Sequence, residues 1–136
     1  MSVVHRFTGE DNSFNWEGAI SGGYTKPNIS GADGKVLIGK ADGAQQFIIR
    51  YFRVEPGGFT SLEKHPHDHG IFILHGRARV LLGTMEVEIG PRDAVYISPN
   101  EIHQMRPVGD EALGFLCVVP PKENEISGCL INNQAL

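Results

Sequence analysis

A run of histidines with a glutamate just before it is the part of the sequence best suited to hold a metal ion. The stretch SLEKHPHDHG, residues 61–70, places histidines at positions 65, 67 and 69, and Glu63 precedes the first of them. Side chains at alternate positions of an extended strand lie on one face, so these groups could converge on one ion. Neutral imidazole and carboxylate are common ligands of divalent transition metals. A further histidine, His103, follows the turn-like stretch SPNE.

The same run has a plainer interpretation, in which its histidines are solvated polar residues. The clustering of three histidines within five residues, with a distant fourth, favours a metal site over that interpretation. Pro66 cannot donate a ladder hydrogen bond, which predicts a bulge or rim there and places His67 toward solvent or behind the ligands. His75, beside Gly76 at a turn, is expected to face outward, and His5 is expected to lie in a loose terminus.

The composition is that of one ordinary globular domain. The chain has 136 residues, with 40% hydrophobic side chains, 21% charged side chains and a net charge of -4. A chain of this length can bury a substantial core, and nothing in its acidic balance points to a nucleic-acid-binding surface. No apolar run reaches the length of a membrane helix or a signal-peptide core, so we expect a cytoplasmic protein with no membrane partner. Cys117 and Cys129 are expected to stay reduced in that compartment.

Short apolar runs between turn residues predict the elements that would position these side chains. The chain contains 17 glycines and 8 prolines, and no long segment shows helical periodicity, which favours an all-β domain. Many short strands linked by hairpins are typical of a jelly roll, in which two sheets close around an interior. The predicted strands are 35–40, 45–54, 70–75, 78–83, 85–89, 94–98 and 113–119.

Two regions resemble the motifs of small single-domain cupins. They are VEPGGFTSLEKHPHDHGIFILHGRARVLLG, from residue 54, and VEIGPRDAVYISPNEIHQMRPVGD, from residue 87. The resemblance covers residues 35–121 and implies a double-stranded β-helix, the cupin barrel, with a metal inside near one mouth. Around it we expect an N-terminal extension, residues 1–34, that wraps the barrel and a C-terminal tail, residues 122–136, all within a single domain.

The family's motif spacing distinguishes among the clustered histidines. Its first motif has a glycine, five residues, a His-x-His pair, a glutamate three or four residues on, and a glycine six residues later. If His65 and His67 were the pair, the third ligand would fall at an isoleucine or a phenylalanine, positions 71 and 72. If Glu63 and His65 fill the pair, the third ligand is His69. The motif glycines then fall at positions 57 and 76, and both are glycine.

The resemblance therefore implies a metal site formed by Glu63, His65, His69 and His103, with one divalent transition metal per chain (Mn, Fe, Ni or Zn). Glu63 stands where the family usually has histidine. His69 stands where glutamate is usual, and one branch of small cupins is similar at that position. Such a set leaves two open positions on an octahedral ion but closes a tetrahedral zinc. Whether Glu63 binds the ion or swings away as a base stays open.

The second motif also departs from the family pattern at four positions, and at two of them, Arg92 and Asn100, the family often has glycine. Asn100 suits a left-handed turn, because asparagine adopts that conformation readily. Arg92 is harder to accommodate, and the bend could instead shift to Asp93.

Strand alternation predicts the lining of the site. A mostly apolar pocket beside one metal suits a small organic substrate. The predicted substrate pocket consists of Gln46, Phe59, Ser61, Ile71, Ile73, Tyr96 and Met105. Glu63 and Tyr96 are the candidate catalytic residues, since either could move a proton.

Three classes of function follow from this interpretation. The resemblance first implies a metal-dependent oxidoreductase of the dioxygenase type that acts on a small organic substrate. The alternative is a metal-dependent isomerase, lyase or hydrolase of a small sugar or carboxylic acid, in which the ion is a Lewis acid. A non-enzymatic binding or sensor barrel is the third possibility. The resemblance also implies a homodimer that covers an exposed sheet edge.

Overall fold

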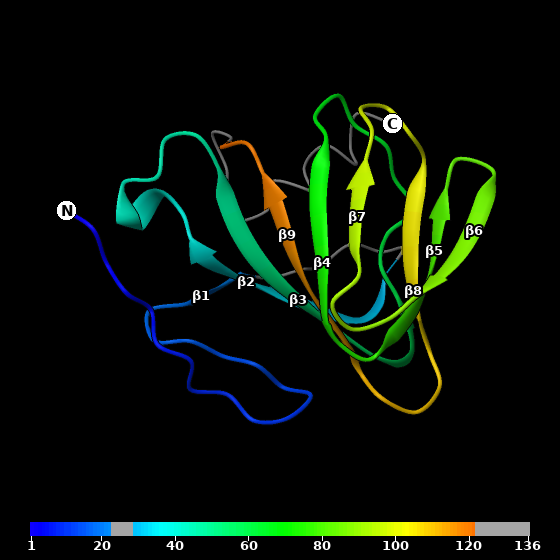
Figure 1. Ribbon diagram of the computed structural model, residues 1–136, viewed down its shortest axis with the longest axis horizontal. Helices are drawn as coiled ribbons and strands as arrows, with labels where there is room; N and C mark the ends of the chain where they lie inside the picture. Colours follow the sequence, from blue (N-terminus) through cyan, green and yellow to red (C-terminus); the bar gives the residue numbers. More distant parts are fainter. Residues whose placement is uncertain (23–28, 122–136) are drawn as a thin grey trace.

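The computed structural model describes residues 1–22 and 29–121, and strands make up most of that part of the chain (Figure 1). In the described part, no helix has both the length and the apolar character that a membrane crossing needs. The elements in chain order are β1 (Ile20–Gly22), β2 (Ser30–Ile38), the 3-10 turn η1 (Lys40–Asp42), β3 (Ile48–Phe59), β4 (His69–His75), β5 (Arg77–Leu82), β6 (Met85–Ile89), β7 (Ala94–Ile97), β8 (His103–Val108) and β9 (Leu113–Val119).

The strands form two antiparallel sheets. The larger sheet has the order β1-β2-β3-β9-β4-β7, and the smaller one has the order β6-β5-β8. The connection from β3 to β4 lies beside β8, where Glu63 and His103 exchange backbone hydrogen bonds of 3.1 and 2.9 Å. This arrangement is the predicted all-β jelly roll, so the expected fold class is confirmed.

Apolar side chains from both sheets fill the space between them. Along β4 the residues Ile71 and Ile73 are buried, and Phe72 between them faces outward. This period of two places one row of side chains in the core. The core consists of Val36, Ile48, Phe52, Val54, Ile71, Ile73, Ala78, Val80, Ile89, Ile97, Met105, Leu113, Phe115, Cys117 and Val119.

Each predicted strand corresponds to an observed one, although several boundaries differ. Strand β2 begins at Ser30, and β3 continues past the predicted end through Pro56 to Phe59. The short β1 and all of β8 had no counterpart in the prediction. Strand β8 contains Pro107, and β8 lies at the edge of its sheet, where proline is tolerated.

Left-handed turns occur at the positions where the motifs need them. Gly57 and Gly76 have φ of 82° and 74°, and a Cβ at Gly76 would lie 2.3 Å from the Ala112 carbonyl oxygen. Asn100 has φ of 62°, as its residue type indicated. Arg92 has φ of 75°, so the arginine itself adopts the left-handed conformation and the bend does not shift to its neighbour. For such a residue this conformation costs about 1–2 kcal/mol.

The N-terminal segment packs on the outer face of the larger sheet. Phe14 stacks on Tyr51 of β3 with ring centroids 6.1 Å apart, and Trp16 meets the same ring edge-on at 5.3 Å. The Phe14 N–H donates to the Tyr51 hydroxyl over 3.2 Å. His5 contacts the Glu17 carbonyl and Asp42, so the expectation of a loose terminus at His5 was wrong.

His75 lies beneath this segment. Its ring is 4.8 Å from that of Phe14 and contacts the Tyr51 hydroxyl. Tyr51 alternates on β3 with Phe52, a core residue, so His75 is on the side of the sheet away from the interior. It is nevertheless only 7% exposed, because the N-terminal segment covers it. The predicted tail, including Cys129, lies outside the described residues.

Candidate metal centre

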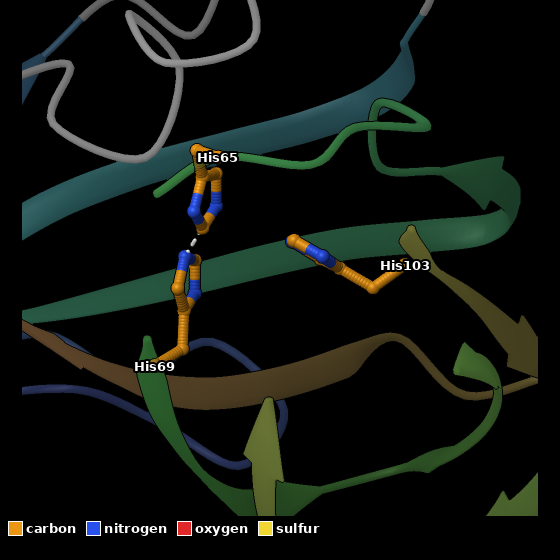
Figure 2. A group of neighbouring side chains, drawn as sticks. All are labelled: His65, His69 and His103. Atoms are coloured by element: carbon orange, nitrogen blue, oxygen red, sulfur yellow. Dashed lines mark hydrogen bonds between the residues drawn. The ribbon is translucent and has the colours of Figure 1, made fainter. Parts of the chain in front are cut away.

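Three histidines from separate parts of the chain meet inside the barrel (Figure 2). His69 begins β4, His103 begins β8, and His65 belongs to the segment that connects β3 to β4. Each offers one ring nitrogen, and these atoms lie within 4.8 Å of one another. All three residues are buried. The backbone fixes this arrangement, because the bridge between Glu63 and His103 ties the connecting segment to β8.

Hydrogen bonds to the far side of the rings orient two of these histidines. The Nδ1 of His65 lies 2.9 Å from the His67 carbonyl oxygen, and the Nδ1 of His103 lies 2.9 Å from the Glu101 carbonyl oxygen. A carbonyl only accepts, so each Nδ1 carries the donated proton. In a neutral ring the Nε2 lone pair then faces the centre of the cluster, as a metal ligand requires.

The nitrogens that face the centre fit a bound cation. The Nε2 of His103 is buried and has no hydrogen-bond partner among the described residues. The Nε2 atoms of His65 and His69 are 2.6 Å apart and share a hydrogen bond, in which His69 donates because His65 carries its proton on Nδ1; an ion would replace that proton. A buried polar atom without a partner costs about 1–3 kcal/mol, and a divalent ion between the rings would satisfy it. Three imidazoles are a suitable donor set for a transition metal.

Glu63 lies at the edge of this cluster. Its Oε1 is 3.7 Å from the Nε2 of His65 and 3.6 Å from the Nε2 of His103. Its Oε2 accepts a hydrogen bond of 2.8 Å from Ser61. Ligands about 2.1 Å from one ion and 90–120° apart would be separated by about 3.0–3.6 Å. Coordination by Glu63 is therefore compatible with its position, and it stays a prediction.

The carboxylate makes the centre attractive to positive charge. Burial by itself raises the pKa of Glu63, but the nearby rings of His103 and His65 and the hydrogen bond from Ser61 outweigh burial and lower the pKa to about 2. For His103, burial by itself lowers the pKa, but Glu63 and the Glu101 carbonyl outweigh burial and raise the pKa above its usual value. The ionised Glu63 thus favours a cation at this point, whether a proton or a metal ion.

His67 is buried, and the expectation that it could face solvent was wrong. Side chains from 61 to 73 alternate between buried and exposed without interruption at Pro66, so His67 faces inward with its neighbours. Its ring stacks on that of His65, with centroids 4.0 Å apart and planes 8° apart. It does not belong to the group of three converging nitrogens. His67 therefore lies behind the ligands, the other position predicted for it.

A pocket opens beside the histidines, with about 360 Å³ of empty space that includes open solvent. Most of its walls are apolar, as in sites that bind small molecules. Of the residues predicted for the pocket, Ser61, Ile71 and Met105 line the cavity. The complete lining is Phe52, Thr60, Ser61, Glu63, His69, Ile71, Ile97, His103, Met105, Phe115 and Cys117.

The other predicted pocket residues lie elsewhere. Ile73 is buried in the core farther along β4, and Gln46 is exposed before β3, which begins later than expected. Phe59 is half-buried beneath the Arg106 guanidinium, 5.0 Å from its ring. Tyr96 is 63% exposed and donates to Asp68 over 2.9 Å, so it does not reach the cavity as a catalytic residue.

Strand register explains the error at Tyr96 and the lining that was missed. On β7, Ile97 pairs with His69 and faces inward, so Tyr96 must face outward. Phe52 and Phe115 are paired across β3 and β9, and their rings stack at 5.5 Å. The apolar runs that contain these residues were visible in the sequence, but cross-strand pairing was needed to show which face each run presents.

The fold and site together define a small β-barrel with a histidine cluster inside. The model of the cupin domain family matches residues 50–119. The chain therefore belongs to the cupin family, as the motif resemblance indicated.

Several known proteins are similar to this chain. A 1-methylthio-D-xylulose 5-phosphate methylsulfurylase from Rhodospirillum rubrum is 48% identical over 71 residues, which are 52% of this chain and 46% of that protein. The match thus spans less than half of that relative's length.

Solved structures match over nearly the whole chain. A cupin-2 domain from Rhodospirillum rubrum is 32% identical with a TM-score of 0.74, covering 90% of this chain and 88% of that one. A cupin 2 domain-containing protein from Halorhodospira halophila is 35% identical with a TM-score of 0.63, covering 98% and 94%. The polyketide cyclase RemF from Streptomyces resistomycificus is 27% identical with a TM-score of 0.73, covering 90% and 80%.

Proposed function

We propose that this cupin is a metal-dependent enzyme that converts a small organic substrate in the cavity beside its histidines. The observation that carries the proposal is the convergence of three buried ring nitrogens, with an adjacent carboxylate, on one point at the cavity. His69, His103 and Glu63 also line the cavity, so a bound substrate would contact the centre.

The residues present fit one divalent ion, which when bound would polarise an oxygen of the substrate as a Lewis acid. His65, His69 and His103 would hold it, and Ser61 would keep Glu63 turned toward it through the 2.8 Å hydrogen bond. Apolar walls would bind the body of the substrate and exclude water. Phe52, Phe115 and Met105 form part of those walls.

Two reaction classes suit this centre, and we place Lewis-acid chemistry first. Among the proteins similar to this chain, a methylsulfurylase and a polyketide cyclase are named for their reactions. These names favour a metal-dependent isomerase, lyase or related transfer on an oxygen-rich substrate, such as a sugar derivative. A dioxygenase-type oxidoreductase is the second candidate, because three imidazoles would leave positions open on an octahedral ion.

Metal loading and oxygen dependence distinguish these classes. The full chain would be stripped with a chelator, reloaded separately with Mn, Fe, Co, Ni or Zn, and assayed with 1-methylthio-D-xylulose 5-phosphate, the substrate in the relative's name. We expect one ion per chain and turnover that continues without oxygen. A strict requirement for oxygen and a redox-active ion would support the oxidoreductase instead. Failure to bind any of these ions would overturn both.

We also propose a homodimer. Exposed apolar side chains on neighbouring strands support it, since Phe72 on β4, Val118 on β9 and Tyr96 on β7 are 40%, 37% and 63% exposed. Light scattering at micromolar concentration tests it, and a monomer mass would overturn it.

A further inference from the structure

The three candidate ligands differ in how the far side of each ring is held. His65 and His103 each direct Nδ1 to a backbone carbonyl, an acceptor that no side-chain substitution removes. The Nδ1 of His69 instead lies 3.4 Å from the sulfur of Cys117. The orientation of His69 therefore depends on a side chain from another strand.

Strand register brings Cys117 to this position. On the central strand β9, Cys117 is opposite Arg50 of β3 on one side and Ile71 of β4 on the other. His69 precedes Ile71 by two residues, so it lies on the same face and diagonally across from Cys117. Cys117, Arg50 and His69 are 1%, 1% and 4% exposed. The contact is thus set by the pairing of the sheet as well as by side-chain conformation.

Arg50 supports the cysteine from the other side. Its Nη2 donates to the Cys117 sulfur over 3.7 Å, and its guanidinium lies over the Phe52 ring, 5.3 Å from the centroid. Arginine can only donate hydrogen bonds, so the sulfur is the acceptor. A row of contacts therefore runs from Arg50 through Cys117 to His69 and ends at the centre of the cluster.

We propose that Cys117 is a positioning residue for metal binding: when an ion replaces the hydrogen bond between His65 and His69, the Cys117 sulfur accepts the Nδ1–H of His69, and Arg50 holds the sulfur in place. This inference rests on the metal centre of the proposed function. With the acceptor present, the His69 proton stays on Nδ1 and Nε2 is available to the ion. Without the acceptor, the ring can turn or carry its proton on Nε2, which opposes metal binding. Loss of such a supporting contact typically weakens metal affinity by about 10–100-fold.

Three variants of the full chain separate this role from simple packing. Cys117→Val keeps an apolar side chain of similar size but removes the acceptor, whereas Cys117→Ser keeps a small acceptor. Ile73→Val is the matched control, because Ile73 is buried on the same strand as His69 and does not line the cavity. Cobalt affinity would be measured by competition with a chelator, together with the visible absorption spectrum of the bound ion.

We expect Cys117→Val to weaken cobalt binding at least about tenfold and to shift the spectrum. Cys117→Ser should stay within about threefold of the unmodified protein, as should Ile73→Val. Unchanged affinity in Cys117→Val, or equal losses in the valine and serine variants, would overturn the inference. If the unmodified protein binds no cobalt, the metal centre itself fails, which is a distinguishable outcome.

A measurement on the unmodified protein removes any dependence on the folding of variants. In the zinc-loaded chain, long-range proton–nitrogen NMR assigns the protonated nitrogen of each histidine. The inference predicts that His69 carries its proton on Nδ1 and binds the ion through Nε2. Zinc binding through the Nδ1 of His69, or a proton on its Nε2, would contradict it.

Discussion

Buried histidines lie on both faces of the larger sheet, and they differ in what their two ring nitrogens contact. On the outer face, His75 donates from Nδ1 to the Ala112 carbonyl over 2.9 Å, and its Nε2 lies 2.6 Å from the Tyr51 hydroxyl. Inside the barrel, the inner face carries His69, and the Nε2 of His103, which comes from the smaller sheet, has no such partner among the described residues and faces Glu63 and the other rings.

This difference shows that burial alone does not mark a ligand histidine. His75 is as buried as His103, at 7% each, but both of its nitrogens are satisfied by the protein. It is a structural residue that ties the N-terminal segment to the sheet. At the inner centre, one nitrogen is held by the protein and the other is left to face a common point, which is the arrangement a metal ligand needs.

The largest expected effect is loss of the metal at the inner centre. His65→Ala and His103→Ala should each weaken metal binding by more than about 100-fold, because each removes a direct ligand rather than a supporting contact. Elemental analysis of dialysed protein measures this. The matched outer variant, His75→Ala, should keep one ion per chain. If His65→Ala and His103→Ala each kept one metal ion per chain, the distinction between the inner and outer histidines would be wrong.

The outer face should instead show its largest effect on folding. His75→Ala removes two hydrogen bonds and leaves the Tyr51 hydroxyl without its histidine partner, so we expect a loss of about 2–3 kcal/mol in the free energy of unfolding. Tyr51→Phe removes the hydroxyl alone and should cost about 1–2 kcal/mol. Urea denaturation followed by fluorescence measures both. A His75→Ala protein as stable as the unmodified one would show that the outer cluster does not stabilise the fold.

The outer histidine also predicts a dependence of stability on pH. Burial, with Arg53 nearby, lowers the pKa of His75 below its usual value despite the hydrogen bond to Ala112. Between that lowered pKa and the unfolded value of about 6.5, the unfolded chain binds more protons, so stability must fall as the pH drops through this window. The urea midpoint of the unmodified protein should therefore fall more between pH 7.5 and 5.5 than that of His75→Gln. Parallel changes in the two proteins would contradict this assignment.

The smallest expected effect on metal binding belongs to His67. Its substitution distinguishes the two assignments of the motif's ligand pair, which are His65 with His67 and Glu63 with His65. His67→Ala removes a ring that stacks on His65 but leaves the backbone carbonyl that accepts from its Nδ1. Metal content should stay at one ion per chain, with at most about a tenfold loss of affinity. Loss of the metal in His67→Ala would favour the register in which His65 and His67 form the ligand pair.

The sequence predicted the fold because local signals were consistent with it. Alternating apolar runs and turn glycines located the strands, and the spacing from Gly57 to Gly76 singled out Glu63, His65 and His69, which the structure brings together with His103. These features depend on neighbours in the chain and on a family motif, so they needed no tertiary information.

Other features depended on long-range pairing and could not be predicted in this way. Tyr96 was assigned to the interior because nothing local shows that Ile97 is the residue opposite His69. Strand β8 had no counterpart in the prediction, and the role of Cys117 arises only when β9 lies between β3 and β4. The contact of Phe14 with Tyr51 likewise joins segments with no shared pattern.

X-ray absorption by zinc bound to the full chain tests the central claim most directly, because it counts the ligands of the ion. The account predicts three imidazole nitrogens at about 2.0–2.1 Å, with any remaining ligands being oxygen and with no sulfur at about 2.3 Å. It also predicts that Cys117→Ser leaves this spectrum unchanged. An ion bound by fewer than three imidazoles, or by sulfur, would contradict the assignment of His65, His69 and His103 as the metal centre.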